Sequence, residues 1–123
     1  MSKRILIVDD IDFIVEFEEK VIDSLSKDLS IKIQVDKSNS VKDALANIDK
    51  HHYDAMVIDI NLPDGSGIDI AKKAQDKSKD TRIAVLTIYP KEYEEHNAYF
   101  DAFFKKPILP TSYKQHIRKL LHI

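Results

Sequence analysis

The sequence contains no cysteine, and its charges are nearly balanced. Without cysteine there is neither a disulfide nor a thiolate metal site, and a reducing cytoplasm is the simplest location for the chain. The 19 Lys and Arg residues against 21 Asp and Glu residues give a net charge of −2. This balance gives no electrostatic reason to expect direct contact with nucleic acid or with an anionic membrane.

Long hydrophobic runs are also absent. No apolar run approaches the roughly 20 residues that span a bilayer, and the run "ILIV" near the N-terminus is too short for a signal-peptide core. We find no repeat, low-complexity tract or internal linker. A chain of 123 residues has a common size for one domain, so residues 1–123 are expected to form a single domain.

Glycine is scarce, and both glycines lie in the same turn. Average usage of about 7% would give roughly four times as many, yet the chain has only Gly65 and Gly67, shortly after Asp59. Glycine provides backbone freedom in tight turns. We therefore expect a tight turn that leaves the surroundings of Asp59 open.

Short apolar runs alternate with helical patterns along the chain. Continuous Ile- and Val-rich runs are typical of strands buried on both faces, whereas an alternating run favours an edge strand. Candidate strands are 4–8, 54–59 and 82–87, with 30–35 as an edge strand and 101–104 as a shorter one. Candidate helices are 12–28, one after the N-cap Ser40, one after the N-cap Ser66, a short one at 90–99, and one that starts near Pro110.

This alternation predicts an α/β fold with three layers, α-β-α, around a five-stranded parallel sheet. Crossovers between parallel strands are right-handed and place helices on both faces of the sheet. The carboxyl ends of all strands then share one edge. In open sheets of this kind, ligands bind at that edge.

Chemically active side chains follow the predicted strands. Three carboxylates in close proximity repel one another unless a cation neutralises them, and oxygen ligands suit Mg²⁺. A lysine in the same pocket would hold an anion, and a threonine hydroxyl would donate to it. These are the groups that phosphoryl transfer onto an aspartate requires. The residues are Asp9, Asp10, Asp59, Thr87 and Lys106.

The chain resembles the receiver domain of response regulators in two-component signalling, and the resemblance covers its whole length. It rests on four segments in the expected order and spacing: "ILIVDD", "VIDINLPDGSG", "VLT" and "FFKKP". It implies a flavodoxin-like fold with strand order 2-1-3-4-5 and Mg²⁺ as cofactor. It implies a protein that catalyses only its own phosphorylation and dephosphorylation. The implied partner is a sensor histidine kinase or a histidine phosphotransfer protein.

The resemblance also implies roles for the acidic residues. Asp59 matches the phosphoryl acceptor and also a metal ligand. Asp10 matches the direct Mg²⁺ ligand, and Asp9 the neighbouring acid that acts largely through metal-bound water. The backbone carbonyl of Asn61 matches the last protein ligand of the metal.

The remaining roles concern the bound phosphoryl group and the switch. Thr87 matches the hydroxyl that bonds the phosphoryl group. Lys106 matches the family's lysine because it directly precedes a proline, often through a cis bond, so Lys105 should point the other way. Phe103 matches the aromatic switch residue. Phosphorylation is then expected to change the surface formed by the fourth helix, the fifth strand and the fifth helix.

Other interpretations stay open. Asp9, Asp10 and Asp12 fit a simple role in capping the first helix. The pair Asp10 and Asp12 also fits an aspartate-nucleophile phosphohydrolase of the haloacid dehalogenase type, although that family needs a later acidic strand, and Asp59 would be left unexplained. A third alternative is a docking module that accepts no phosphate, although all five site positions are intact.

The segment between Thr87 and Lys106 and the C-terminal end bear on the output of the domain. Thr87 and Lys106 are only 19 residues apart, which predicts a short or irregular fourth helix. The chain fits both a free-standing regulator and the front of a larger one with a C-terminal effector domain, and we favour the second. A phosphorylation-dependent homodimer is a further alternative.

Overall fold

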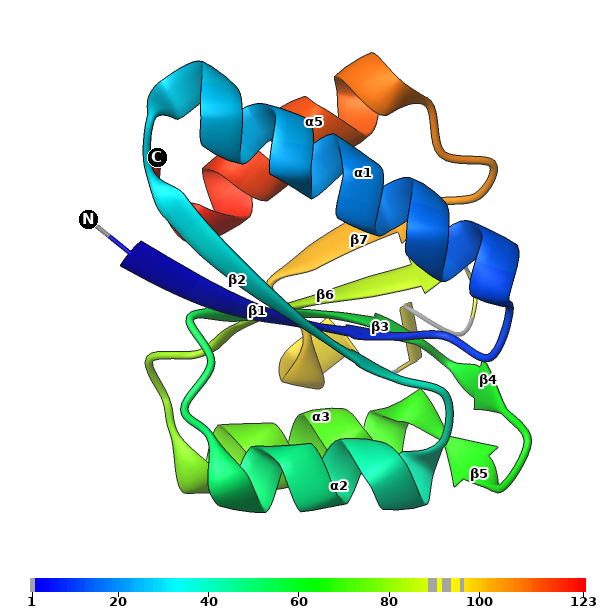
Figure 1. Cartoon of the computed structure of the whole chain (residues 1–123). Coiled ribbons are helices and arrows are strands. Elements are labelled where there is room, and N and C mark those ends of the chain that lie inside the picture. The colour runs from blue at the N-terminus through cyan, green and yellow to red at the C-terminus, as the bar shows by residue number, and fades with distance from the viewer. Residues whose placement is uncertain (1, 89–90, 92–93, 96) are drawn as a thin grey trace.

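Five parallel strands form the centre of the computed structural model, which describes residues 2–88, 91, 94–95 and 97–123. The sheet order is β2-β1-β3-β6-β7 (Figure 1). Counting only the strands of this sheet, this is the predicted order 2-1-3-4-5. The strands are β1 (Ser2–Val8), β2 (Lys32–Ser38), β3 (Ala55–Asp59), β6 (Arg82–Thr87) and β7 (Ala102–Lys105).

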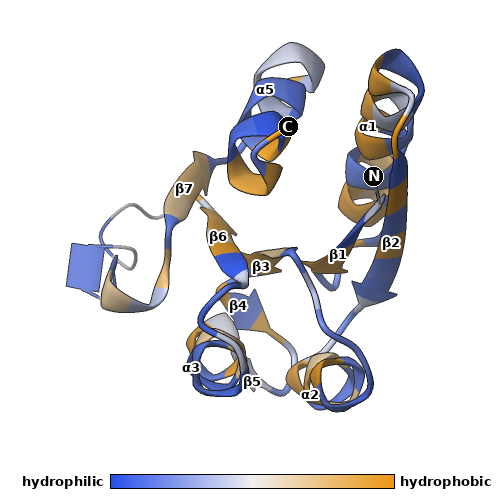
Figure 2. Cartoon of the chain, turned by 90° about the vertical axis from the view of Figure 1, so that its left-hand side faces the viewer, coloured by the Kyte–Doolittle hydropathy of each residue, from blue (hydrophilic) through white to orange (hydrophobic). Residues whose placement is uncertain are grey.

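Helices cover both faces of the sheet, as the three-layer prediction requires. Helices α1 and α5 lie on one face, and α2 and α3 lie on the other (Figures 1 and 2). Their apolar sides face the sheet and their polar sides face outward (Figure 2). The helices are α1 (Asp12–Leu29), α2 (Val41–Lys50), α3 (Gly67–Lys77) and α5 (Pro110–Leu121).

The sheet separates two hydrophobic cores. Along β1, Ile5 and Ile7 belong to the core under α1 and α5, whereas Leu6 and Val8 belong to the core under α2 and α3. Because both faces are covered, the strand is a continuous apolar run rather than an alternating one. Strand β2 is an edge strand of the sheet, as predicted, and its exposed and buried residues vary along its length.

Local signals set the helix ends. The Ser40 hydroxyl accepts a hydrogen bond from the Asp43 N–H at 3.1 Å, and the Ser66 hydroxyl accepts one from the Ile68 N–H at 3.2 Å. Pro110 is the first residue of α5. The three predicted helix starts are therefore confirmed.

Two features differ from the prediction. A small antiparallel hairpin, β4 (Asn61–Leu62) and β5 (Gly65–Ser66), follows β3, and the sequence pattern did not indicate it. The helix expected at 90–99 falls partly on residues 90, 92–93 and 96, which lie outside the described residues. In the described part, Lys91, Glu94 and Glu95 are helical, and the 3-10 helix η1 spans Asn97–Tyr99.

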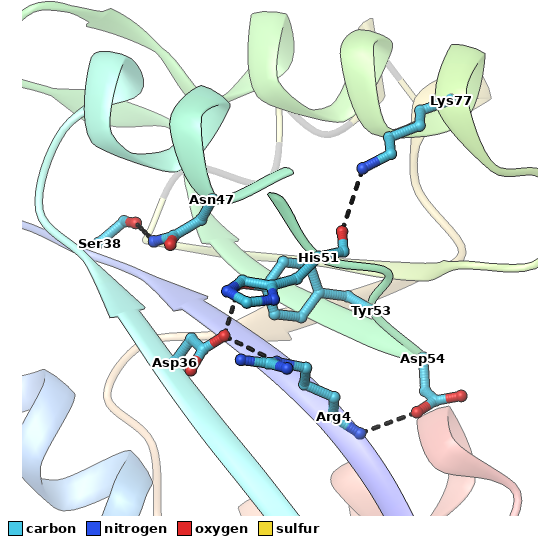
Figure 3. A network of polar contacts seen from close by, with 8 residues as sticks. All are labelled: Arg4, Asp36, Ser38, Asn47, His51, Tyr53, Asp54 and Lys77. Atoms are coloured by element: carbon cyan, nitrogen blue, oxygen red, sulfur yellow. Dashed lines mark hydrogen bonds and ion pairs between the residues drawn. The ribbon is translucent and has the colours of Figure 1, made fainter. Parts of the chain in front are cut away.

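A polar network joins β1 to its neighbours (Figure 3). The Arg4 guanidinium donates to Asp36 of β2 at 2.9 Å, the Tyr53 hydroxyl donates to the same carboxylate at 2.7 Å, and the Arg4 N–H donates to Asp54 at 2.8 Å. Burial raises the pKa of Asp36, but the bonds from Arg4 and Tyr53 outweigh it and the net pKa is lowered. The charge of Asp36 is therefore matched by that of Arg4.

In the described part of the chain, no helix is long and apolar enough to span a membrane.

Candidate functional site

Strand register brings the predicted site residues to one edge of the sheet. Val8 of β1 pairs with Ile58 of β3, so Asp9 and Asp59 follow at the same level of neighbouring strands. Thr87 ends β6 and pairs with Lys105 of β7, directly before Lys106. The carboxyl ends of β3 and β6 lie beside the β4–β5 hairpin (Figure 1).

Three carboxylates and one ammonium group meet there. Asp9, Asp10 and Asp59 each place one oxygen within 4.8 Å of the others. The Lys106 Nζ lies 3.2 Å from Asp59 Oδ2 and 3.4 Å from Asp9 Oδ2. Lys105 is exposed. Lys106, and not Lys105, is therefore the lysine that lies beside the carboxylates.

Burial and neighbouring charges shift the pKa values of these groups. Burial raises the pKa of Asp59 and of Asp9, and the favourable interactions with Lys106 and with backbone N–H groups only partly oppose it. Burial lowers the pKa of Lys106, but the two carboxylates outweigh it and the net pKa is raised. One ammonium therefore does not compensate the carboxylates, in contrast to the matched charges around Asp36.

Backbone contacts hold the side chains in place. The Ile11 N–H donates to Asp9 Oδ1 at 2.9 Å, and the Asn61 N–H donates to Asp59 Oδ1 at 3.3 Å. The Lys106 N–H donates to the Thr87 carbonyl at 3.2 Å, and the peptide bond from Lys106 to Pro107 is cis. Asp9 and Asp59 thus each have one carboxylate oxygen bonded to a main-chain N–H and the other facing Lys106.

Gly67 has a different role from the one that the sequence suggested. A Cβ at this position would lie 2.2 Å from the Asp59 carbonyl oxygen and 2.7 Å from Ile58 Cγ2. The first residue of α3 packs directly on the backbone of Asp59, and only glycine permits this approach. Backbone freedom is needed at Gly65, where φ is 156°. The two glycines therefore serve two separate purposes.

The sequence matches the family model of the response regulator receiver domain over residues 5–118. The chain belongs to this family. Among curated relatives, it is 28% identical over 127 residues to the hybrid signal transduction histidine kinase L of Dictyostelium discoideum, a match that covers 94% of this chain and 7% of the relative. The chain spans between 7% and 39% of the lengths of the curated relatives it matches.

Solved structures agree with this assignment. The CheY-like receiver domain protein of Methanospirillum hungatei JF-1 superposes with a TM-score of 0.86 at 26% identity, over 99% of this chain and 95% of that one. The response regulator TrrA of Thermotoga maritima, solved in complex with Mg²⁺-BeF, superposes with a TM-score of 0.77 at 29% identity, over 97% and 99% of the two chains. The chain is a receiver domain of the two-component type with the flavodoxin-like fold.

The acidic pocket of this receiver fits a divalent cation. Asp9 Oδ2 is buried and accepts no hydrogen bond from any described residue, and it lies only within ion-pair distance of Lys106. Its carboxylate is almost fully buried, whereas Asp10 is exposed. A buried carboxylate oxygen without a hydrogen bond is costly. An oxygen-binding cation such as Mg²⁺ would satisfy it.

The two predicted switch residues lie on adjacent strands of the receiver. Thr87 is buried at the end of β6. Phe103 of β7 pairs with Val85 and is partly buried against the core under α2 and α3, whereas its neighbour Phe104 is buried in the core under α1 and α5. The position of Phe103 suits a side chain that can become more or less exposed.

A buried acid of the receiver was missed at the sequence level. Glu18 of α1 has no exposed surface, and its Oε1 accepts a hydrogen bond from the Tyr113 hydroxyl of α5 at 2.7 Å. A readable signal existed, because Glu18 is four residues after Ile14 and four before Ile22 in the apolar stripe of α1. An acid at that spacing faces the core.

Proposed function

We propose that this receiver domain accepts a phosphoryl group from a phosphohistidine onto Asp59, in a Mg²⁺-dependent reaction that it catalyses on itself alone. One observation carries the proposal: a single ammonium, that of Lys106, lies within 3.4 Å of two buried carboxylates whose pKa values are raised. Such a pocket takes up a further cation and then an anionic phosphoryl group.

In the transfer step, a carboxylate oxygen of Asp59 attacks the phosphorus. The phosphorus–nitrogen bond of the phosphohistidine breaks, and its electron pair remains on the imidazole nitrogen, which then takes a proton. Lys106 and the Thr87 hydroxyl donate to the transferring phosphoryl oxygens. Bound Mg²⁺ supplies further charge compensation for these oxygens. It would be held by Asp9, Asp10 and Asp59 and by the backbone carbonyl of Asn61.

The output follows from the acyl phosphate. The phosphoryl group attracts the Thr87 hydroxyl, and the vacated space lets Phe103 turn inward, which shifts the population of two surface states. Because Phe103 has no hydroxyl, its inward position can change the surface only through packing and not through a new hydrogen bond. The responding surface consists of β7, α5 and the segment before β7.

The partner is a sensor histidine kinase or a histidine phosphotransfer protein in the cytoplasm. The relatives extend well beyond the matched region, which supports an effector domain or another module attached to this receiver. Neither nucleic acid nor a membrane is a partner of this domain itself. A homodimer that forms on phosphorylation is compatible with the responding surface.

The rival functions lack structural support. A haloacid dehalogenase-type phosphohydrolase needs a further acidic strand after its lysine, and the described residues after Lys106 form only α5. A docking module that accepts no phosphate would not explain why Asp9 and Asp59 are buried together beside Lys106. Steady turnover of a phosphate ester would favour the first rival, and failure to bind beryllofluoride with Mg²⁺ would favour the second.

The replacement Asp59→Asn tests the proposal. We expect acetyl phosphate with Mg²⁺ to phosphorylate the wild-type protein once and the variant not at all, as measured by intact-protein mass spectrometry. Asp69→Asn, at an exposed acid in the first turn of α3, is the control and should be phosphorylated like wild type. Equal phosphorylation of Asp59→Asn and wild type would show that the acceptor is another residue.

A further inference from the structure

Asp64 joins the hairpin after the acceptor strand to the start of α2. Its carboxylate accepts hydrogen bonds from the Val41 N–H at 2.7 Å and from the Lys42 N–H at 3.0 Å, so it bonds two free amides of a helix that lies 22 and 23 residues earlier in the chain. The Lys42 and Val41 amides hold the pKa of Asp64 below its ordinary value. At neutral pH this side chain is therefore negatively charged, and it accepts hydrogen bonds from amides at the positive end of the helix dipole.

Asp64 is not needed simply to start α2. The Ser40 hydroxyl already accepts from the Asp43 N–H, and the Ser40 carbonyl accepts from the Ala44 N–H. Helix α2 thus has its own local cap. The bonds to Asp64 add a connection between α2 and the tip of the β4–β5 hairpin.

The hairpin itself is short and is held at both ends. At its base, the Gly67 N–H donates to the Ile60 carbonyl at 2.7 Å, and Gly67 packs on the Asp59 backbone. At its tip, Gly65 lies so close to α2 that an added Cβ would be 3.3 Å from Val41 Cγ2. Between these points, two residue pairs join β4 and β5, one of which is Asn61 with Ser66. A pair of two-residue strands is too short to be stable alone.

We propose that Asp64 is a positioning residue for the cation site: by fixing the hairpin tip to α2, it holds the backbone of Asn61 in place beside Asp59. The inference rests on the proposed function, in which the Asn61 carbonyl is a metal ligand. Asp64 acts through the backbone and does not touch the cation. Groups that orient metal ligands typically change metal affinity by about 10- to 100-fold when they are removed.

The experiment measures the affinity for Mg²⁺ alone by isothermal titration calorimetry, using the full chain. We expect Asp64→Ala to weaken Mg²⁺ binding about tenfold. We expect Asp64→Asn, which keeps one acceptor oxygen, to weaken it less. Asp43→Ala is the matched control, because it removes one negative charge from the first turn of the same helix without touching the hairpin. Its affinity for Mg²⁺ should equal that of wild type.

The thermal unfolding midpoint is measured for each variant, because a helix-capping role alone would lower it without changing Mg²⁺ affinity. Unchanged affinity in Asp64→Ala, or an equal loss in Asp43→Ala, would overturn the inference while the proposed function stands, provided that wild type is still phosphorylated by acetyl phosphate. If Asp64→Ala does not fold, unchanged Mg²⁺ affinity of Asp64→Asn overturns the inference in the same way. Wild-type protein that neither binds Mg²⁺ nor accepts a phosphoryl group would overturn both proposals.

Discussion

At the scale of single residues, the site depends on how closely main chain and side chains approach Asp59. Its Oδ2 faces Lys106, its Oδ1 accepts from the Asn61 N–H, and its carbonyl oxygen lies against Gly67. Three neighbours thus contact three different atoms of one residue. A small change at any of these positions therefore acts directly on the proposed acceptor.

Replacing Gly67 with alanine tests this close approach. The added Cβ would collide with the Asp59 backbone, which cannot move as a flexible side chain would. We expect the free energy of unfolding to fall by about 2 kcal/mol or more, as measured by urea denaturation. Gly65→Ala provides the comparison, because it meets only a side-chain methyl but has an unfavourable φ. Wild-type stability of Gly67→Ala would contradict the contact described for this glycine.

At the scale of elements, α1 and α5 are joined by a buried polar contact within an apolar core. Tyr113 of α5 packs against Phe17 and Phe104 and donates to Glu18. The pKa of Glu18 is raised to about 8, and burial is the main cause. The negative charge of Asp9 also raises it, whereas Tyr113 and Lys106 lower it. The Glu18 proton is therefore coupled electrostatically to the site at the end of β1.

The pH dependence of stability should reveal Glu18. Its pKa is raised on folding, so its stabilising contribution is complete below the ordinary value of about 4.5 and is lost as pH rises to about 8. We expect Glu18→Gln to lack this loss, which is on the order of 4 to 5 kcal/mol. The measurement is the difference in free energy of unfolding between variant and wild type at a series of pH values.

In this comparison, the variant should become the more stable protein as pH rises, because glutamine carries no charge into the core. Using the difference cancels the titration of groups that do not interact with Glu18, so what remains is Glu18 itself and its coupling to Asp9, Asp59 and Lys106. A difference that stays constant from pH 4.5 to 8 would mean that Glu18 is ionised in the folded protein.

Sequence patterns predicted the five strands of the parallel sheet, four of the helices and the convergence of Asp9, Asp10, Asp59 and Lys106. That was feasible because these residues lie within two positions of the end of an apolar run, and the alternation of elements determines which edge they share. The bonds of Asp64 to α2 and of Glu18 to Tyr113 were not predictable in this way. They join residues 22 to 23 and 95 positions apart, and no periodic pattern links such partners.

At the scale of the whole molecule, exposed apolar side chains gather at one end. Among the described residues, the large hydrophobic side chains left exposed follow β1, follow β6 or precede α5, all at the edge that carries Asp59. A cluster of exposed apolar side chains around a polar pocket is typical of a surface that contacts another protein. These residues are Ile11, Phe13, Ile88 and Leu109.

Phe13 is the most exposed of them, at 77%, and tests this surface. We expect Phe13→Ala to slow phosphoryl transfer from a phosphorylated histidine phosphotransfer protein about tenfold, the size of effect that a truncated interface residue often has. Phosphorylation by acetyl phosphate should be unchanged, because the small donor does not contact Phe13. Lys32→Ala, at the opposite end of the sheet, is the control. An equal loss of phosphorylation rate with both donors would mean that Phe13 affects the phosphoryl transfer itself rather than the docking of the partner.

The separation of the two cores by the sheet has a consequence for evolution. The hairpin with Asn61 and Asp64 is attached to the α2–α3 side, whereas Glu18 and Tyr113 belong to the α1–α5 side. Substitutions around the hairpin can therefore accumulate over generations without repacking the core under α1 and α5.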